Sequence, residues 1–437
     1  KLDIGASYII QNDRNMTNQG IYSNPIVPVY LFPRGDDFGL VKVFERWDPA
    51  RKINTMFWPQ GEGDYRMQNP YWIAYRNLRL NQKKRYMLSA QLSYDITDWL
   101  NISGRVRVDN THTKYEQKLY ASSNLTITEE STQGHYTISK PDETQTYADV
   151  LANINKRFND FSLVANVGAS IVNNRYEDLS YRGPIREKGI PNVFNVFDLD
   201  NTKKKARQDE WQEQTQSIFA SVEVGWKSML YLTLTGRNDW FSALSYKGKT
   251  SPNHIFYPSV GLGFILSEAI QMPSWFPYLK LRGSWAQSGG AVGAYQLGLT
   301  YSYADAYRKY PVGSIDNGTI PNLNLKPLTS ISYEGGFEAR FFNNRFGIDF
   351  TYYVRNTKDD IVNAGISTAS GYGNVKINAG KVNNHGIELL LTGTPILSSH
   401  FRWDTSFNFA YNKSEIKRIT DDVTEFELAK SRTGHDS

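Results

Sequence analysis

The chain has 437 residues, with 49 basic and 44 acidic side chains, no cysteine, and aromatic residues at 14% of its positions. So many aromatic residues exclude a disordered segment, which would lack apolar surface, and a net charge of +5 over this length excludes a nucleic-acid-binding footprint. The absence of cysteine excludes disulfides and thiolate metal sites, and the mean hydropathy of -0.52, with no apolar run of roughly 18 residues, excludes transmembrane helices but not a transmembrane β-barrel.

Strands are predicted in chain order from the alternation of apolar and polar residues. The first strand covers Lys1–Ile10, and six hairpins follow it. Their strands pair residues 89–96 with 100–110, 147–157 with 161–173, 215–226 with 229–238, 256–266 with 278–287, 329–341 with 345–356, and 382–393 with 400–412. Asp, Asn and Ser occupy most of the short turns inside the pairs, as tight turns require. The pattern therefore predicts about thirteen strands.

The segment Arg345–Arg355 illustrates the two faces of these strands. One face carries Phe346, Ile348, Phe350, Tyr352 and Val354, and the other carries Arg345, Gly347, Asp349, Thr351, Tyr353 and Arg355. An Arg that faced lipid near the bilayer midplane would cost roughly 2 to 4 kcal/mol. We therefore expect the apolar face to contact outer-membrane lipid and the polar face to line a wet interior.

The connections between the hairpins are long, whereas the turns inside them are short. Residues 12–82, 111–146, 174–214 and 288–328 form the long connections. Compact soluble domains seldom contain a structureless loop above ~15 residues. A soluble β-sandwich or propeller would show the same alternation, but it would require neither these uneven loop lengths nor the aromatic residues gathered beside the short turns.

The predicted fold class is therefore all-β: an antiparallel transmembrane β-barrel with short periplasmic turns and long extracellular loops. Single-chain bacterial barrels usually have an even number of strands, and an open sheet edge in hydrocarbon leaves backbone groups unpaired. About thirteen strands are thus expected to be part of a larger barrel.

Several short motifs, in order and at family-like spacing, carry a resemblance to a known family. They are residues 28–35 (PVYLFPRG), 69–72 (NPYW), 92–100 (LSYDITDWL), 236–239 (GRND), 257–261 (YPSVG), 279–285 (LKLRGSW), 324–326 (NLK), 357–360 (TKDD) and 383–388 (NNHGIE). Together they make the chain similar to the SusC/RagA-type TonB-dependent transporters of Gram-negative outer membranes. It departs from the family pattern at Trp240-Phe241, Pro327-Leu328 and Gly289-Gly290, which lie at loop bases and bear on the ligand rather than the fold.

The resemblance covers the barrel portion of the family only. Residues 1–437 are expected to be a fragment of the barrel domain, without the plug, the N-terminal accessory domain or the remaining C-terminal strands. Barrels of this kind close at about 22 strands around a plugged lumen. The expected location is the outer membrane of a Gram-negative bacterium.

The function implied by the resemblance is TonB-dependent import of a bulky nutrient, an oligosaccharide or a peptide. The implied partners are a SusD-like surface lipoprotein acting as a lid, and the TonB complex acting through the missing N-terminal parts. Candidate contacts with substrate or lid are the loop aromatics and the charged residues near strand tops: Tyr71, Trp72, Arg237, Asp239, Trp240, Phe241, Arg355 and Asp359. Loop packing, interface anchoring and paired lumen charges are the competing roles for these residues.

No motif of an enzyme or a cofactor site stands out. The six His residues show no paired-ligand spacing, and neither a Gly-x-Ser-x-Gly elbow nor a phosphate-binding or dinucleotide motif is present. We therefore predict no catalytic residues, no metal and no cofactor. Two alternatives stay open: an outer-membrane hydrolase, and a barrel that serves mainly as a structural partner in a surface or biogenesis complex.

Overall fold

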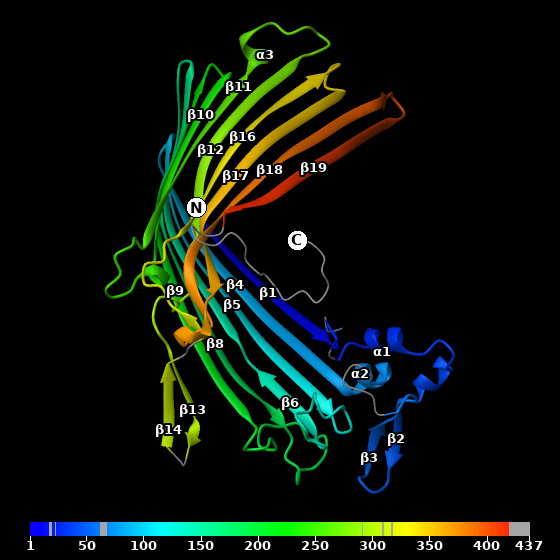
Figure 1. The fold of residues 1–437 in the computed structure, drawn as a ribbon. Coiled ribbons are helices and arrows are strands. Elements are labelled where there is room, and N and C mark those ends of the chain that lie inside the picture. Colours follow the sequence, from blue (N-terminus) through cyan, green and yellow to red (C-terminus); the bar gives the residue numbers. More distant parts are fainter. Residues whose placement is uncertain are drawn as a thin grey trace.

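A computed structural model describes residues 1–16, 20–21, 23–61, 68–290, 292–307, 310–315 and 318–418. The chain folds into one long antiparallel meander that curls into an open trough (Figure 1). Its thirteen principal strands, each paired with the next, are β1 (Leu2–Arg14), β4 (Asn77–Thr97), β5 (Leu100–Tyr120), β7 (Asp142–Phe158), β8 (Phe161–Pro184), β9 (Lys205–Trp226), β10 (Leu230–Phe241), β11 (His254–Ile265), β12 (Tyr278–Gly290), β16 (Leu328–Phe341), β17 (Phe346–Gly365), β18 (Asn374–Leu397) and β19 (Arg402–Arg418).

These thirteen strands match the thirteen expected from the sequence, and the all-β antiparallel fold class is confirmed. Two short strands complete the sheet: β6 (Gly134–Ser139) lies between the outer ends of β5 and β8, and β15 (Thr319–Ile320) runs parallel to β18. Within the described residues, β1 pairs with β4 and β19 pairs with β18, so these two strands form the edges of the trough.

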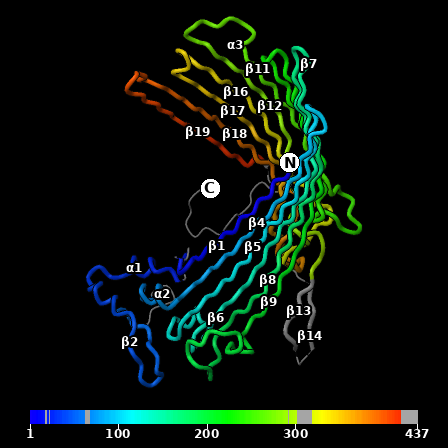
Figure 2. The backbone as a smooth tube through the Cα atoms, turned by 180° about the vertical axis from the view of Figure 1, so that it is seen from behind, coloured from blue at the N-terminus to red at the C-terminus, as the bar shows by residue number. Residues whose placement is uncertain are grey.

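The two ends of the trough differ (Figure 2). Short turns lie at one end, and the loop elements gather at the other. The turn between β9 and β10 is a tight one, with Lys227 and Ser228 at φ 49° and 56°, the left-handed conformation of a type I′ hairpin. The short helix α3 (Leu266–Ala269) joins β11 to β12. This is the predicted arrangement of periplasmic turns and extracellular loops.

The loop end carries the remaining small elements. They are α1 (Ile26–Leu31), η1 (Phe38–Lys42), β2 (Glu45–Asp48), β3 (Ile53–Met56), α2 (Pro70–Arg76), η2 (Ser242–Leu244), β13 (Tyr301–Tyr307), β14 (Tyr310–Ile315) and η3 (Thr368–Ser370). In the described parts of the chain, every helix is too short or too polar to cross a bilayer.

The outer strand ends lie well beyond the sequence-predicted limits. The expected connection 174–214 is mostly strand, because β8 runs on to Pro184 and β9 already begins at Lys205. The expected connection 111–146 likewise contains the end of β5, all of β6 and the start of β7. The outer halves of these strands carry polar residues on both faces, so they lack the alternation that reveals a strand in lipid.

Contacts between side chains on the same face confirm the predicted two faces. On the polar face, Arg105 of β5 pairs with Asp149 of β7 at 2.7 Å, and Arg282 of β12 donates to Asp349 of β17 at 2.5 Å. On the apolar face, the rings of Phe337 and Phe350 lie 5.7 Å apart. The face with the charges lines the interior, as the cost of Arg in lipid requires.

The periplasmic end of the apolar face shows the anchoring expected at a membrane interface. Lys156 lies on this face beside the turn from β7 to β8, with its Nζ 4.8 Å from the ring centroid of Trp99 and 5.2 Å from that of Phe158. A Lys at this depth extends its ammonium group toward water while its stem stays apolar. Aromatic residues around it belong to the interfacial girdle that the sequence predicts.

Candidate ligand-binding surface

The helix α2 positions the first two predicted contact residues. Its N-cap, Asn69, accepts a hydrogen bond from the backbone N–H of Tyr71 at 2.9 Å. The Asn69 amide also donates to the carbonyls of Val41 (2.8 Å) and Phe57 (3.0 Å). Pro70 occupies the first helical position, where its missing N–H leaves no hydrogen bond unmade. One buried side chain thus ties the helix to two separate segments of the first outer loop.

Trp72 is fully buried at the centre of this loop cluster. Its indole Nε1 donates to Ser123 Oγ at 2.9 Å, and Ser123 in turn donates to Asn77 Oδ1 at 2.9 Å. The chain of hydrogen bonds joins α2, the start of β4 and the loop after β5. Trp72 therefore packs inside the loops and presents no ring face to a ligand.

Tyr71 belongs to a different environment, a set of three near-parallel rings that we name the outer aromatic cluster: Phe44, Tyr71 and Tyr75. The centroid separations are 5.5 Å for Phe44–Tyr75, 6.4 Å for Phe44–Tyr71 and 6.5 Å for Tyr71–Tyr75. Tyr75 is 55% exposed. The cluster thus offers solvent a group of aromatic rings at the outer end of the trough.

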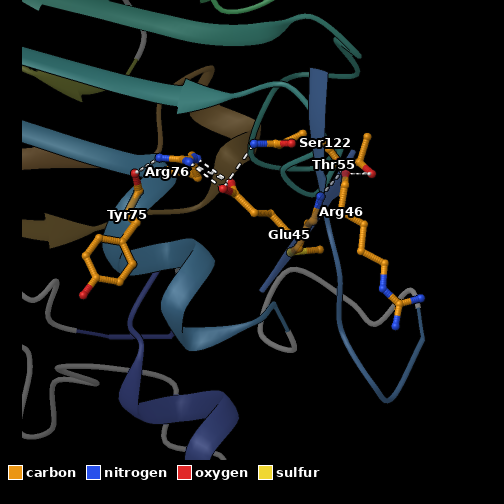
Figure 3. A network of polar contacts seen from close by, with 8 residues as sticks. Glu45, Arg46, Thr55, Tyr75, Arg76 and Ser122 are labelled. Atoms are coloured by element: carbon orange, nitrogen blue, oxygen red, sulfur yellow. Dashed lines mark hydrogen bonds and ion pairs between the residues drawn. The ribbon is translucent and has the colours of Figure 1, made fainter. Parts of the chain in front are cut away.

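An ion pair fixes the base of the outer aromatic cluster (Figure 3). Arg76 donates to the Glu45 carboxylate through Nε (2.9 Å) and Nη2 (2.8 Å), a two-pronged geometry. The same guanidinium lies 5.8 Å from the ring centroid of Phe44 and 5.5 Å from that of Tyr120. The Tyr75 ring points away from this polar network. A bidentate pair between α2 and β2 therefore holds the rings without covering them.

Tyr71 was predicted from the sequence as a contact residue, whereas Phe44 and Tyr75 were not. The signal for Tyr75 was available, because residues four apart on a helix share a face and Asn69-Pro70 marks a helix start. Phe44 carries no such local signal. It reaches the cluster through the packing of the first outer loop.

Arg237 and Asp239 lie together on the interior face of β10. Arg237 Nε donates to Asp239 at 2.7 Å, and its Nη2 donates to Ser217 Oγ of β9 at 2.8 Å. Its guanidinium lies 5.5 Å from the ring centroid of Phe219. Asp239 is buried, and Arg237 is partly exposed. The pair leaves one partly exposed cation on the wall.

The next two residues of β10, Trp240 and Phe241, lie in different environments. Trp240 takes the outward parity, is 38% exposed, and has its ring centroid 6.4 Å from that of His254. Phe241 is buried in a small core with Leu244, Val292, Leu297 and Leu325. Trp240 thus sits where an interfacial aromatic would, and Phe241 stabilises the loops.

The small core is reinforced by the Asn-Leu-Lys motif at 324–326. Asn324 accepts a hydrogen bond from Thr250 Oγ1 at 2.9 Å, the Leu325 carbonyl accepts from Ser251 at 3.1 Å, and the Lys326 N–H donates to Asn378 at 2.8 Å. The motif therefore joins the β10–β11 loop, the β12–β16 loop and β18.

Arg355 and Asp359 lie on β17, toward its outer end. Arg355 is exposed and donates to Ser332 Oγ at 3.3 Å. Asp359 has a φ of 59° and faces Gly380, whose φ is 86°, at a point where the β17–β18 register skips both residues. Asp359 and Gly380 therefore interrupt the ladder together, both at positive φ, and the register continues unchanged beyond them, a feature that strand parity could not predict.

A second polar cluster lies beside the outer ends of β6 and β8. His135 is buried, with its Nε2 3.6 Å from Glu129, whose carboxylate accepts from Arg182 at 2.7 Å. Burial lowers the pKa of His135 below its usual value, and the charges of Arg182 and Lys205 lower it further against the opposing effect of Glu129. Its Nδ1 has no protein hydrogen-bond partner. The imidazole is therefore held in its neutral form near pH 7.

The eight predicted residues thus fall into three groups, on α2, β10 and β17. Trp72 and Phe241 are buried in loop cores, and the other six keep surface or stand in the wall. In the part of the chain that the structure describes, no group of three or more His, Asp or Glu side chains is arranged to hold a metal ion.

Comparisons with known proteins agree with this architecture. Residues 13–434 match the family model described as TonB dependent receptor-like, beta-barrel. The chain is 27% identical over 285 residues to TonB-dependent receptor P39 of Formosa agariphila, covering 62% of this chain and 26% of that protein. It is 27% identical over 217 residues to TonB-dependent receptor SusC of Bacteroides thetaiotaomicron, covering 47% of this chain and 21% of that protein.

Solved structures show the same fold. A structure of the RagAB peptide transporter superimposes with a TM-score of 0.77 at 18% identity, covering 98% of this chain and 46% of that one. The chain therefore spans less than half the length of these similar proteins.

Proposed function

Because the chain belongs to the TonB-dependent receptor-like β-barrel family of the Gram-negative outer membrane, we propose that it forms part of the wall of a transporter that imports a bulky nutrient. The family is one of transporters and receptors, not of enzymes. The observation that carries the proposal is the trough itself: a wide sheet with a charged interior face and a thick cluster of ordered loops at one end. Such a wall suits a large solute better than a small ion.

The proposed solute is an oligosaccharide or a peptide, captured beneath a SusD-like surface lipoprotein and released by the TonB complex through parts of the protein outside this chain. The similarity to SusC and to the RagAB peptide transporter supports this choice. The outer loops support it as well, because they are packed around buried residues such as Trp72 and Leu325 and so can present a firm surface to a lid.

The proposed contact residues are Tyr71, Arg237, Arg355 and Asp359, with the outer aromatic cluster as the strongest element. Trp240 has the outward parity, so it is proposed to anchor the wall at the membrane interface instead. Aromatic rings with open faces bind the apolar faces of sugars and the side chains of peptides, and each such contact contributes about 0.5 to 1.5 kcal/mol. Trp72, Phe241 and Asp239 are proposed to support these contacts from behind, because all three are buried.

The test is uptake and binding by the full-length transporter carrying Tyr71→Ala and Tyr75→Ala. We expect each change to weaken ligand binding by between about twofold and about tenfold, with the amount of folded barrel unchanged. Tyr30→Ala is the matched control, because Tyr30 is 85% exposed on α1 and lies outside the cluster. If a variant that carries both changes bound the ligand as tightly as the parent, the outer aromatic cluster would not be part of the ligand-binding surface. Uptake that persists without TonB would contradict energy-coupled import.

A further inference from the structure

The outward face of the sheet contains an apolar groove that the import function does not use. It crosses β4, β5, β7, β8 and β9 and has a volume of about 1070 Å³. The floor of the groove is made of small residues, namely Ala90, Gly104, Ala148 and Ala169, and larger side chains stand around it, namely Leu92, Val106, Val150, Ile171 and Ile218. All nine share the parity of the apolar face, since the directly opposite pairs Leu92–Gly104, Gly104–Val150 and Ala169–Ile218 follow one another across the sheet.

The outer rim of the groove is uncharged and mostly polar, and Trp240 of β10 stands in it beside Gln216. Along β9 the outward residues change from Ile218 to Gln216 and Gln214, which marks the outer boundary of the lipid-facing band. Ser242, Ser245 and Asn253 of the β10–β11 loop complete the rim. The loop is fixed there by a hydrogen bond from the Gln214 N–H to Ser242 Oγ at 2.8 Å. The rim therefore offers amide and hydroxyl groups just where the head groups of outer-leaflet lipids lie.

Two charged residues border the groove, but neither contributes a free charge to it. Arg105 and Asp149 line it through their strand positions, but they pair with one another at 2.7 Å and have the interior parity. A phosphate-rich head group would require free cations. The uncharged rim favours a head group that presents hydroxyl or amide groups.

We propose that this groove is a binding site for one outer-leaflet lipid, with an acyl chain on the small-residue floor and the hydroxyl or amide groups of its head at the rim. The groove is continuous with the lipid-facing band, so the acyl chains of membrane lipids are next to it. Its concave floor contacts a chain on several sides, whereas the rest of a barrel wall contacts lipid on one side only. The site is independent of the imported ligand, so its failure would leave the import proposal unaffected.

The test fills the groove in the full-length transporter with Gly104→Leu. A side chain has room there, because the nearest atom to an added Cβ is the Asp149 carbonyl oxygen at 3.9 Å. Gly335→Leu is the matched control: Gly335 lies on the same outward face, opposite Tyr352 on β17, and nothing lies within 4 Å of an added Cβ. Both proteins are placed in nanodiscs with a trace of lipid carrying a photoreactive acyl chain. One arm uses a glycolipid and the other uses phosphatidylethanolamine.

Photolabelled peptides are then mapped by mass spectrometry. We expect the glycolipid to label the walls of the groove at least fivefold more than the face around Gly335, with Gly104→Leu abolishing this excess and Gly335→Leu preserving it. Stronger labelling by phosphatidylethanolamine would overturn the head-group assignment. Uniform labelling of the whole outward face would contradict a specific lipid site in the groove. Cross-links from the groove to a second copy or to another part of the chain would contradict it as well.

Discussion

Trp72 and Tyr71 are neighbours on one short helix, yet Trp72 is buried and Tyr71 lies at the surface. The Trp72 indole donates to Ser123 inside the loop cluster, whereas the Tyr71 ring joins Phe44 and Tyr75 at the surface. Both residues were predicted as contacts from the same four-residue motif. The motif identified the location, but which side chain is buried depends on the loop after β5, which packs on the helix from far along the chain.

Replacing Trp72 by Phe tests the role of the buried indole. The change leaves the Ser123 hydroxyl without its donor and removes apolar contacts, so we expect a loss of about 1 to 3 kcal/mol in the local opening free energy of the loops. Hydrogen exchange of residues 68–77 and 120–125 in the full-length protein would measure it. Trp47→Phe is the control, since Trp47 is 61% exposed. Equal exchange in both variants would contradict the structural role.

His135 makes the outer loops sensitive to pH. Its pKa is lowered in the folded state, mainly by burial, so the unfolded state binds more protons below the ordinary value of about 6.5. Stability is therefore fully present above that value and is lost as the pH falls toward the lowered pKa. We expect the protection factors of residues 129–139, which correct for the slower intrinsic exchange in acid, to be lower at pH 5.5 than at pH 7.5, and His135→Asn to weaken this dependence. His400→Asn, at a periplasmic turn, should leave it unchanged.

At the scale of the element, strand prediction succeeded where lipid imposes alternation and failed where it does not. The periplasmic halves of β8 and β9 alternate, but their outer halves, after Asn173 and before Gln214, are polar on both faces. Only the pairing of backbone groups with the neighbouring strand extends β8 and β9 into these outer halves, and that pairing leaves no periodic pattern in the sequence. The interruption at Asp359 and Gly380 was equally unpredictable, because Asp in a strand signals neither a positive φ nor a skipped partner.

The interruption of the ladder at Asp359 and Gly380 predicts an asymmetry between two glycines of the β17–β18 hairpin. Gly380 has a φ of 86°, so Gly380→Ala forces a side chain into the left-handed region at a cost of about 1 to 2 kcal/mol. Gly365→Ala lacks this conflict, since its φ is not in that region and nothing lies within 4 Å of an added Cβ. We expect the first variant alone to increase hydrogen exchange in residues 360–379. Matching exchange in the two variants would contradict the left-handed conformation of Gly380.

At the scale of the whole molecule, one rule of parity determines which residues meet lipid, which line the interior and which can bind a solute. Leu390 and Leu391 of β18 are chemically identical neighbours on opposite faces. Leu390 lies opposite Asp349 on the charged face, and Leu391 lies opposite Ile348 and Phe407 on the apolar face. The residue type does not show which of these two leucines meets lipid, whereas the register of the sheet does.

Placing Lys at each of the two positions tests the orientation of the entire wall. Leu391→Lys puts an ammonium group into the lipid-facing band, at a cost of roughly 2 to 4 kcal/mol, so we expect much less folded barrel in the outer membrane. Leu390→Lys places the same group opposite Asp349 in the wet interior, and assembly should be close to that of the parent. Heat-modifiable mobility of the full-length protein on gels measures the folded fraction. The reverse order of tolerance would mean that the sheet is turned inside out, and equal tolerance would mean that neither face meets lipid.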